Sequence, residues 1–194
     1  MILVACMVLA AASVPATGGR LEALADVRLR HVWLLTVSLG AQVLIFTIAP
    51  ELAPEHVMAA IHLGTYALAS TFLLVNPQLP GLRLMALGGA ANLAAIAANG
   101  GVMPARDGAL RLAGRPVEAD VFVNSGVVDG ARLAWLGDVF AIPAGWPLAN
   151  VFSIGDVLLV VGGFVALHTA CGSRLVPSHR RHVTTVEPPP VPSG

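Results

Sequence analysis

The sequence predicts an all-α protein, a polytopic membrane helix bundle of about five transmembrane helices with a long extracytoplasmic loop. Of the 194 residues, 56% are hydrophobic and only 11% are charged, and the mean hydropathy is +0.79. A soluble domain carries about 25% charged residues, so this chain has too few to cover its own surface in water. Lipid is therefore the expected solvent for most of the chain. Because the net charge is zero and lysine is absent, no nucleic-acid partner is expected.

The first apolar run covers residues 1–14 and is broken by Pro15. It has no basic start, which favours a short membrane helix, although small residues near its end leave a removed signal peptide as the alternative. The polar segment that follows, residues 15–31, has a partial apolar face and is typical of an interfacial helix.

Four further apolar runs, separated by polar or proline-containing segments, each approach the ~20 residues that a bilayer requires. They cover residues 33–49, 57–75, 82–98 and 151–170. Residues 100–150 form the long loop, and the basic, proline-rich residues 173–194 predict a disordered cytoplasmic tail. Residues 1–172 are then one transmembrane domain.

Arginine placement predicts the orientation of the chain. Seven of the 11 arginines lie after the first span, in the turn before the span at residues 82–98, and in the tail. The other four lie in the long loop, whose length weakens its influence on insertion. The amino terminus and the long loop are therefore expected outside, and the carboxyl terminus inside.

Small residues inside the spans predict close helix contacts. Gly88 and Gly89 lie within the span at residues 82–98, where they let a neighbouring helix approach. Cys6 and Cys171 have no metal-ligand spacing and fall at different depths, so both are expected to pack as small apolar side chains. No metal or other cofactor is expected.

Polar side chains inside the spans are the candidates for function, because lipid disfavours them. His62 and Tyr66 are four residues apart and share a helix face, as Asn92 and Asn99 do at a spacing of seven. Gln42 lies near the middle of its span. For all of these, hydrogen bonds that hold helices together are the alternative to a functional role.

Asp156 is the most informative of the intramembrane polar residues. A carboxylate within a membrane helix costs at least ~2.5 kcal/mol, so such residues usually face a bundle interior and mark function. The alternative is that Asp156, with Ser153, caps the amino end of the last span, where the helix dipole favours a negative charge.

The long loop carries five acidic residues, and all but Asp138 are expected at the solvated surface. Asp138 lies in the apolar segment 133–140, in which Trp135 is expected to anchor the chain at the membrane interface. The crossing from Asp138 to Asp156 is short enough to return to the mouth of the last span and bring the two carboxylates together. Two carboxylates that share a site cannot both ionise easily, and such a pair can act as acid and base on a water molecule.

Motifs spread along the whole chain resemble a family of bacterial membrane proteins known as domain of unknown function 5317. They are Gly18–Leu21, Asn99–Pro104, Arg132–Asp138 and Asn150–Asp156. This resemblance implies a multi-pass protein of the bacterial cytoplasmic (inner) membrane and no particular activity.

The carboxyl third is also distantly similar to signal peptidase II, the intramembrane aspartyl protease that trims prolipoproteins at the outer side of the membrane. The similar segments are Leu136–Val139 and Phe152–Asp156, with a weaker likeness at Gly88–Asn92. Since both aspartates of that family are catalytic, the resemblance implies that Asp138 and Asp156 form a catalytic dyad.

This chain departs from the protease in two respects. The Asp-Arg pair that follows the weaker segment in the protease is absent, and Asp129 with Arg132 is the candidate to replace it. The chain also has an extra span, and the loop at residues 100–150 stands where the protease has a short segment.

The first expected function is an aspartyl hydrolase that acts on a lipid-anchored or membrane-embedded substrate at the outer face. Asp138 and Asp156 would activate water, and Asn92, Asn99 and Ser153 would position the substrate or orient the acids.

Two non-catalytic functions are the alternatives. A binder or carrier of a lipid or small polar molecule would line a polar pocket with Gln42, His62 and Tyr66, together with Asn92 and Asp156. An accessory subunit would dock a partner on the long loop instead.

Overall fold

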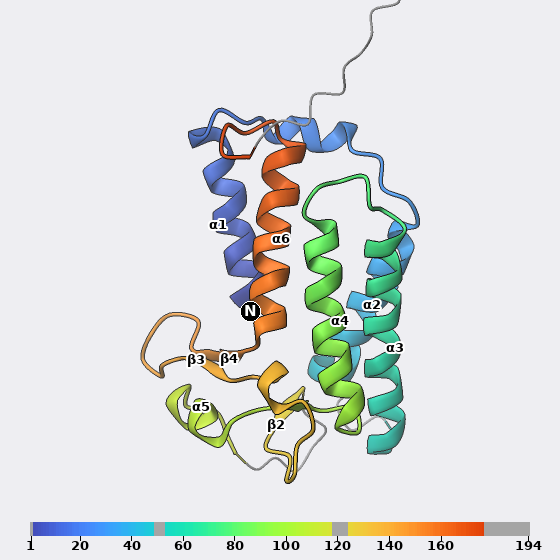
Figure 1. Cartoon of the computed structure of the whole chain (residues 1–194), viewed down its shortest axis with the longest axis vertical. Helices are drawn as coiled ribbons and strands as arrows, with labels where there is room; N and C mark the ends of the chain where they lie inside the picture. Colours follow the sequence, from blue (N-terminus) through green and yellow to red (C-terminus); the bar gives the residue numbers. More distant parts are fainter. Residues whose placement is uncertain (1, 49–52, 118–123, 177–194) are drawn as a thin grey trace, which may run out of the picture.

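The protein is mostly helical, and the computed structural model describes residues 2–48, 53–117 and 124–176. Its long helices run side by side as a bundle and lie at the five places where the sequence predicts apolar spans (Figure 1). They are α1 (Ile2–Ala16), α2 (Val32–Val43), α3 (Glu55–Leu74), α4 (Leu82–Ala98) and α6 (Ile154–Ala170). A π-helical turn, η2 (Leu44–Ile48), continues α2.

Within the described residues, α3 is the one helix both long and apolar enough to cross a membrane by itself, with 20 residues. The other four long helices are apolar but shorter, between 10 and 17 residues each, with η2 counted as part of α2. The predicted helices are thus present, whereas five full-length spans are not established by helix length.

The contact between α4 and α6 is the most extensive in the bundle, and it depends on glycine. A Cβ atom built on Gly88 would lie 2.5 Å from the carbonyl oxygen of Gly155 and 2.9 Å from Cβ of Leu158. The prediction that Gly88 allows a neighbouring helix to approach closely is therefore confirmed. Gly89 faces α3 instead, where a Cβ atom would lie 3.7 Å from Oγ of Ser70, an ordinary contact.

Helix α1 packs along α6 through a polar contact as well as an apolar one. Val14 is buried, and Oγ of Ser13 lies 3.1 Å from Nε2 of the buried His168. The hydroxyl of Ser173 donates to that of Thr17 at 2.8 Å, which joins the ends of both helices. Helix α1 runs to Ala16 rather than breaking at Pro15. At its end, the hydroxyl of Thr17 and the N–H of Gly19 both donate to the carbonyl of Val14.

One end of the bundle collects the segments expected on the inner side. The 3₁₀ helix η1 (Leu21–Asp26), the turn between α3 and α4, and the chain after α6 lie together there (Figure 1). The predicted interfacial helix in residues 15–31 is thus present as a 3₁₀ helix. Most of the predicted tail, residues 177–194, lies outside the described residues.

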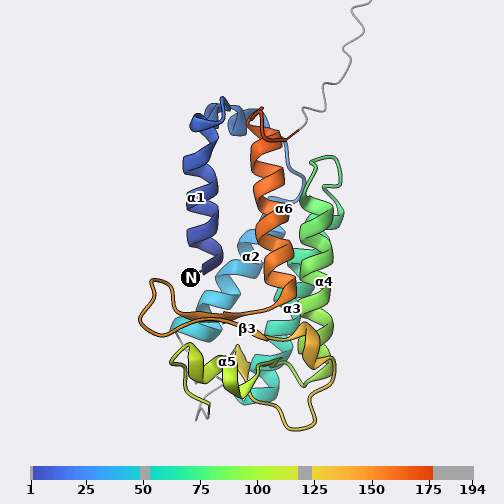
Figure 2. The ribbon, with the colours of Figure 1, turned by 60° about the vertical axis from the view of Figure 1, so that its left-hand side comes forward.

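The opposite end of the bundle carries a small folded unit, made by residues 100–117 and 124–153 and called the cap below. Its elements are β1 (Met103–Pro104), α5 (Asp107–Leu112), β2 (Ser125–Gly126), η3 (Ala134–Leu136), β3 (Phe140–Ile142) and β4 (Asn150–Phe152). Strand β1 pairs in parallel with β2, and β3 pairs in antiparallel fashion with β4 (Figures 1 and 2). A core of small side chains lies between α5 and β4.

The expectation of a plain loop at residues 100–150 was therefore wrong in its described part. Helix α6 also begins at Ile154 and not at residue 151, because Asn150–Phe152 pair with β3 instead of joining the helix. Strands of two or three residues are too short to show a periodic apolar pattern, so they cannot be predicted from the sequence.

Candidate functional site

Asp156 lies in the first turn of α6, where it closes a capping box with Ser153. The N–H of Asp156 donates to Oγ of Ser153 at 3.0 Å, and the N–H of Ser153 donates to Oδ2 of Asp156 at 3.0 Å. Each bond satisfies a backbone N–H that the helix itself leaves unpaired. The capping role, considered as the alternative for Asp156, is thus present in the structure, and it uses one of the two carboxylate oxygens.

The second carboxylate oxygen of Asp156 is held from the neighbouring helix. Asn92 on α4 donates its Nδ2–H to Oδ1 of Asp156 at 2.9 Å, and its Oδ1 accepts from the hydroxyl of Ser153 at 2.9 Å. The ring of Tyr66 on α3 lies against the imidazole of His62, with ring centroids 5.3 Å apart. Asn92 and Ser153 are both fully buried, so their bonds fix the orientation of Asp156. Both polar atoms of the Asn92 amide are occupied in this arrangement.

Asp138 is built into the cap by its backbone. Its N–H donates to the carbonyl of Pro104 at 2.9 Å, and its carbonyl accepts from the N–H of Arg106 at 3.1 Å. The residue therefore extends the ladder of β1 on the side opposite β2. The side chain is only 4% exposed, and its Oδ2 accepts a hydrogen bond of 2.5 Å from the hydroxyl of Ser125.

The electrostatic environment of Asp138 favours its protonated form. Burial raises the pKa of Asp138 to about 6, the bond from Ser125 lowers it, and the charge of Asp156 raises it further. The charge of Asp156 is thus felt at Asp138, although the two residues are 18 positions apart in the sequence.

The β3–β4 hairpin lies between the two aspartates in the chain. Asp138 lies two residues before β3 begins, and Asp156 lies four residues after β4 ends. Phe140 pairs with Phe152 across the hairpin, and their rings stack with centroids 5.3 Å apart. The short crossing predicted to return the chain to the mouth of the last helix is thus a paired hairpin whose two ends carry the two acids.

Three of the other predicted site residues form hydrogen bonds with groups other than Asp138 and Asp156. Gln42 donates to Oγ1 of Thr65 at 3.1 Å and joins α2 to α3. His62 is buried, and its Nδ1–H donates to the carbonyl of Gly101 at 2.9 Å. Asn99 exchanges two hydrogen bonds with the backbone of Arg132, of 2.7 and 2.9 Å. These contacts favour the interpretation that Gln42, His62 and Asn99 hold helices and cap together.

Ser125, which was not among the predicted site residues, donates the one side-chain hydrogen bond that Asp138 accepts within the described residues. The contact depends on parallel pairing of β1 with β2, which is made between distant residues. Asp129 and Arg132 are both exposed, and Arg132 bonds through its backbone to Asn99. Within the described residues, neither side chain forms a hydrogen bond or an ion pair with Asp156. Glu118 and Asp120, expected at the surface, lie outside the described residues.

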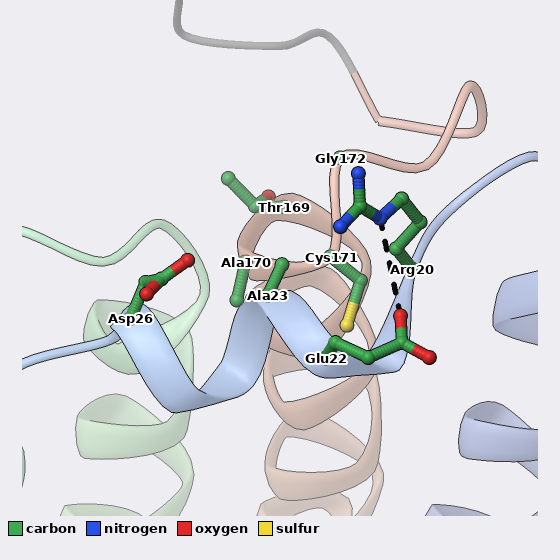
Figure 3. A pocket seen from close by; sticks show the side chains of 8 residues that line it. All are labelled: Arg20, Glu22, Ala23, Asp26, Thr169, Ala170, Cys171 and Gly172. Atoms are coloured by element: carbon green, nitrogen blue, oxygen red, sulfur yellow. Dashed lines mark ion pairs between the residues drawn. The ribbon is translucent and has the colours of Figure 1, made fainter.

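A separate pocket of about 350 Å³ lies at the opposite end of the bundle, between η1 and the end of α6. Figure 3 shows Cys171 beside Glu22 in this pocket, with the ion pair of 3.9 Å between Arg20 and Glu22 at its edge. None of the predicted site residues lines it. Among the residues that the structure describes, no group of three or more His, Cys, Asp or Glu side chains could hold a metal ion.

Fold and site together define a helix-bundle protein in which a small cap at one end of the bundle carries a buried aspartate, Asp138, and the first turn of the last long helix carries a second aspartate, Asp156. A family of unknown function, DUF5317, matches residues 26–168, and the chain belongs to that family.

A protein of Thermotoga maritima, described as an uncharacterized protein, is 27% identical over 101 residues. The match covers 52% of this chain and 58% of that protein, so the chain spans less than two thirds of this relative. No solved structure matches the chain.

Proposed function

We propose that the chain is a multi-pass protein of the bacterial cytoplasmic membrane. Large apolar side chains point outward from every long helix, among them Val8 on α1, Val37 on α2, Leu74 on α3, Leu87 on α4 and Val161 on α6. Only 33% of the most apolar stretch of α3 is buried, whereas the core helix of a water-soluble protein is mostly buried. An apolar outer surface of this extent is what lipid would cover.

Helix length is compatible with this proposal. The 17 residues of α4 or α6 rise about 25 Å at 1.5 Å per residue. That is a few Å less than the ~30 Å core of a typical bilayer, and local thinning accommodates such a mismatch at fractions of a kcal/mol per Å.

The orientation proposed places the cap and the amino terminus outside and the end of α6 inside. The segments that carry Arg20, Arg28, Arg30, Arg83 and Arg174 gather at the end of the bundle away from the cap (Figure 1). Positive residues near the ends of spans are retained on the cytoplasmic side.

We further propose that this protein is an aspartyl hydrolase of the signal peptidase II type, acting at the outer face. The observation that carries the proposal is that one hairpin connects two aspartates with different hydrogen-bond partners, a hydroxyl for Asp138 and an amide with a backbone N–H for Asp156. Asp138 is buried with a pKa of about 6, so it carries a proton for part of the time near neutral pH. Asp156 accepts from an amide and a backbone N–H, which are donors that stabilise a charged carboxylate.

This difference assigns a role to each acid. Asp156 accepts a proton from a bound water as the water oxygen attacks a carbonyl carbon, and Asp138 donates its proton to the carbonyl oxygen. When the tetrahedral intermediate collapses, the leaving amine takes the proton held by Asp156, and Asp138 regains its own. Asn92 and Ser153 act through Asp156 and are positioning residues.

The substrate class follows from where the pair lies. Both acids are at the junction between the cap and the apolar bundle, so a substrate must present its scissile bond at the membrane surface. A lipid-anchored or membrane-embedded peptide meets that requirement.

The test uses the purified full chain in liposomes that contain a lipid-anchored peptide with a cleavage reporter. Asp138→Asn and Asp156→Asn are each expected to abolish cleavage, and the native rate is expected to fall as the pH rises through about 6, where Asp138 loses the proton that it donates. Asp129→Asn, an exposed acid of the same cap, is the matched control and should retain the native rate. Undiminished cleavage by either of the first two variants would overturn the proposed dyad.

A further inference from the structure

The β3–β4 hairpin has a composition unlike that of a water-exposed hairpin. Residues 139–155 contain no charged side chain at all. Yet the hairpin is not covered by the rest of the chain, because Phe140, Trp146 and Leu148 are all exposed, and Trp146 is 69% exposed. An uncharged surface with a large aromatic residue at its tip needs something other than water to cover it.

The tip of the hairpin is an ordered turn. The N–H of Trp146 donates to the carbonyl of Pro143 at 3.1 Å, and the N–H of Ala149 donates to the carbonyl of Trp146 at 3.2 Å. Leu148 adopts a left-handed backbone conformation with φ 65°, which costs a non-glycine residue about 1–2 kcal/mol. The turn thus holds Trp146 and Leu148 on the outside of the hairpin and does not fold them inward.

The hairpin surface is continuous with the apolar outer face of α6. Ile154, Val157 and Val161 follow directly along the chain and are exposed on that helix. Both views place the hairpin across the end of the bundle, beside the amino-terminal end of α1 (Figures 1 and 2). The same layer that covers the outer face of α6 therefore reaches the hairpin.

We infer that the β3–β4 hairpin lies in the interfacial layer of the outer leaflet, with Trp146 and Leu148 among the lipid headgroups and upper acyl chains. This inference rests on the membrane location proposed above. Tryptophan concentrates at the boundary between headgroups and hydrocarbon, where its ring is apolar and its N–H can still meet water. A lipid surface fits the hairpin better than a protein partner does, since the hairpin offers no charge for a partner to recognise and merges with a lipid-facing helix.

The position of the hairpin in the lipid interface sets the depth of the two aspartates in the membrane. Asp138 and Asp156 flank the two ends of the hairpin, so a hairpin seated in the interface holds both carboxylates at the level where the peptide of a lipid-anchored substrate leaves the membrane.

The test measures tryptophan depth in nanodiscs. The chain has three tryptophans, so Trp33→Phe with Trp135→Phe leaves Trp146 as the only one. Trp135→Phe with Trp146→Phe leaves Trp33, at the start of α2, as the matched control for bilayer insertion. Both are read by quenching with phosphatidylcholine brominated at upper or at terminal acyl positions, and with aqueous iodide.

Trp146 is expected to be quenched more by upper than by terminal bromines, which places it about 15 Å from the bilayer centre, half of the ~30 Å core thickness. Quenching of Trp33 by bromolipid while Trp146 responds only to iodide overturns the hairpin inference and leaves the membrane location intact. A Trp146 shielded from both quenchers also overturns it, because protein then covers the hairpin. If neither tryptophan responds to bromolipid, the membrane location itself fails.

A second variant keeps the test decisive if the double substitutions do not fold. Trp146→Phe alone, in the otherwise native chain, is expected to reduce the bromolipid-quenched emission, since Trp146 is one of three tryptophans. No loss of quenched emission overturns the inference.

Discussion

Two adjacent glycines of α4 provide a matched test of the helix packing that supports the site. Gly88 and Gly89 are both buried in the same helix. A methyl group at position 88 would meet the backbone of α6, 2.5 Å from the carbonyl oxygen of Gly155, whereas a methyl at position 89 would lie 3.7 Å from the Ser70 hydroxyl. A backbone carbonyl cannot change rotamer as a side chain can, so the added methyl group of Gly88→Ala must push α4 and α6 apart.

The size of the effect follows from the difference between the two variants. Replacing glycine by alanine in a helix gains roughly 0.5–1 kcal/mol in either case, and this gain cancels between the two. Overpacking at position 88 costs about 1–3 kcal/mol that position 89 does not incur. For a chain of this size each kcal/mol shifts the melting temperature by roughly 2–4 °C, so Gly88→Ala should melt roughly 2–12 °C below Gly89→Ala.

The assay is thermal unfolding of both purified variants in the same detergent and at the same scan rate. Gly89→Ala is expected at or slightly above the native melting temperature, and Gly88→Ala below it. Equal melting temperatures for the two variants would show that α4 and α6 do not approach at Gly88 and would refute the reasoning.

Two further predictions concern buried polar groups. The pKa of Asp138 is raised from 3.8 to about 6 in the folded protein. Its contribution to the free energy of unfolding is therefore complete below pH 3.8 and is lost as the pH rises through about 6. The loss is at most about 3 kcal/mol. The melting temperature of the native chain should therefore fall across this range relative to Asp138→Asn, and parallel pH profiles would contradict the shift. Ser13→Ala leaves Nε2–H of the buried His168 without its acceptor and should cost about 1–3 kcal/mol. Thr36→Ala, which removes an exposed hydroxyl bonded within its own helix, is the control; equal losses in the two variants would argue against docking of α1 on α6.

The helices were the most predictable part of this fold. Helix α4 begins and ends where the sequence predicts, at residues 82 and 98, because the Pro80-Gly81 and Asn99-Gly100 pairs bound its apolar run. The start of α6 was predicted three residues early, since Val151 and Phe152 are as apolar as the helix that follows and only the pairing of Asn150–Phe152 with β3 makes them part of a strand.

The candidate site was partly predictable. Asp138 and Asp156 stand out because each is an acid in an apolar setting, and the crossing between them is short enough to fold back. The roles of Asn92 and Asn99 could not be separated by sequence, because both are amides on one helix. The structure joins Asn92 to Asp156 and Asn99 to the backbone of Arg132.

By itself, then, the sequence determined the helical class of this protein, the places of its five long helices and the identity of its two unusual acids. Those features depend on composition and on the spacing of neighbouring residues, which the chain carries locally. Only the tertiary structure decided that residues 100–117 and 124–153 fold as a cap, that Ser125 meets Asp138, and that Asn92 holds Asp156. Each of these depends on hydrogen bonds between residues far apart in the chain, and no local pattern of side chains specifies which distant partner a buried polar group will find.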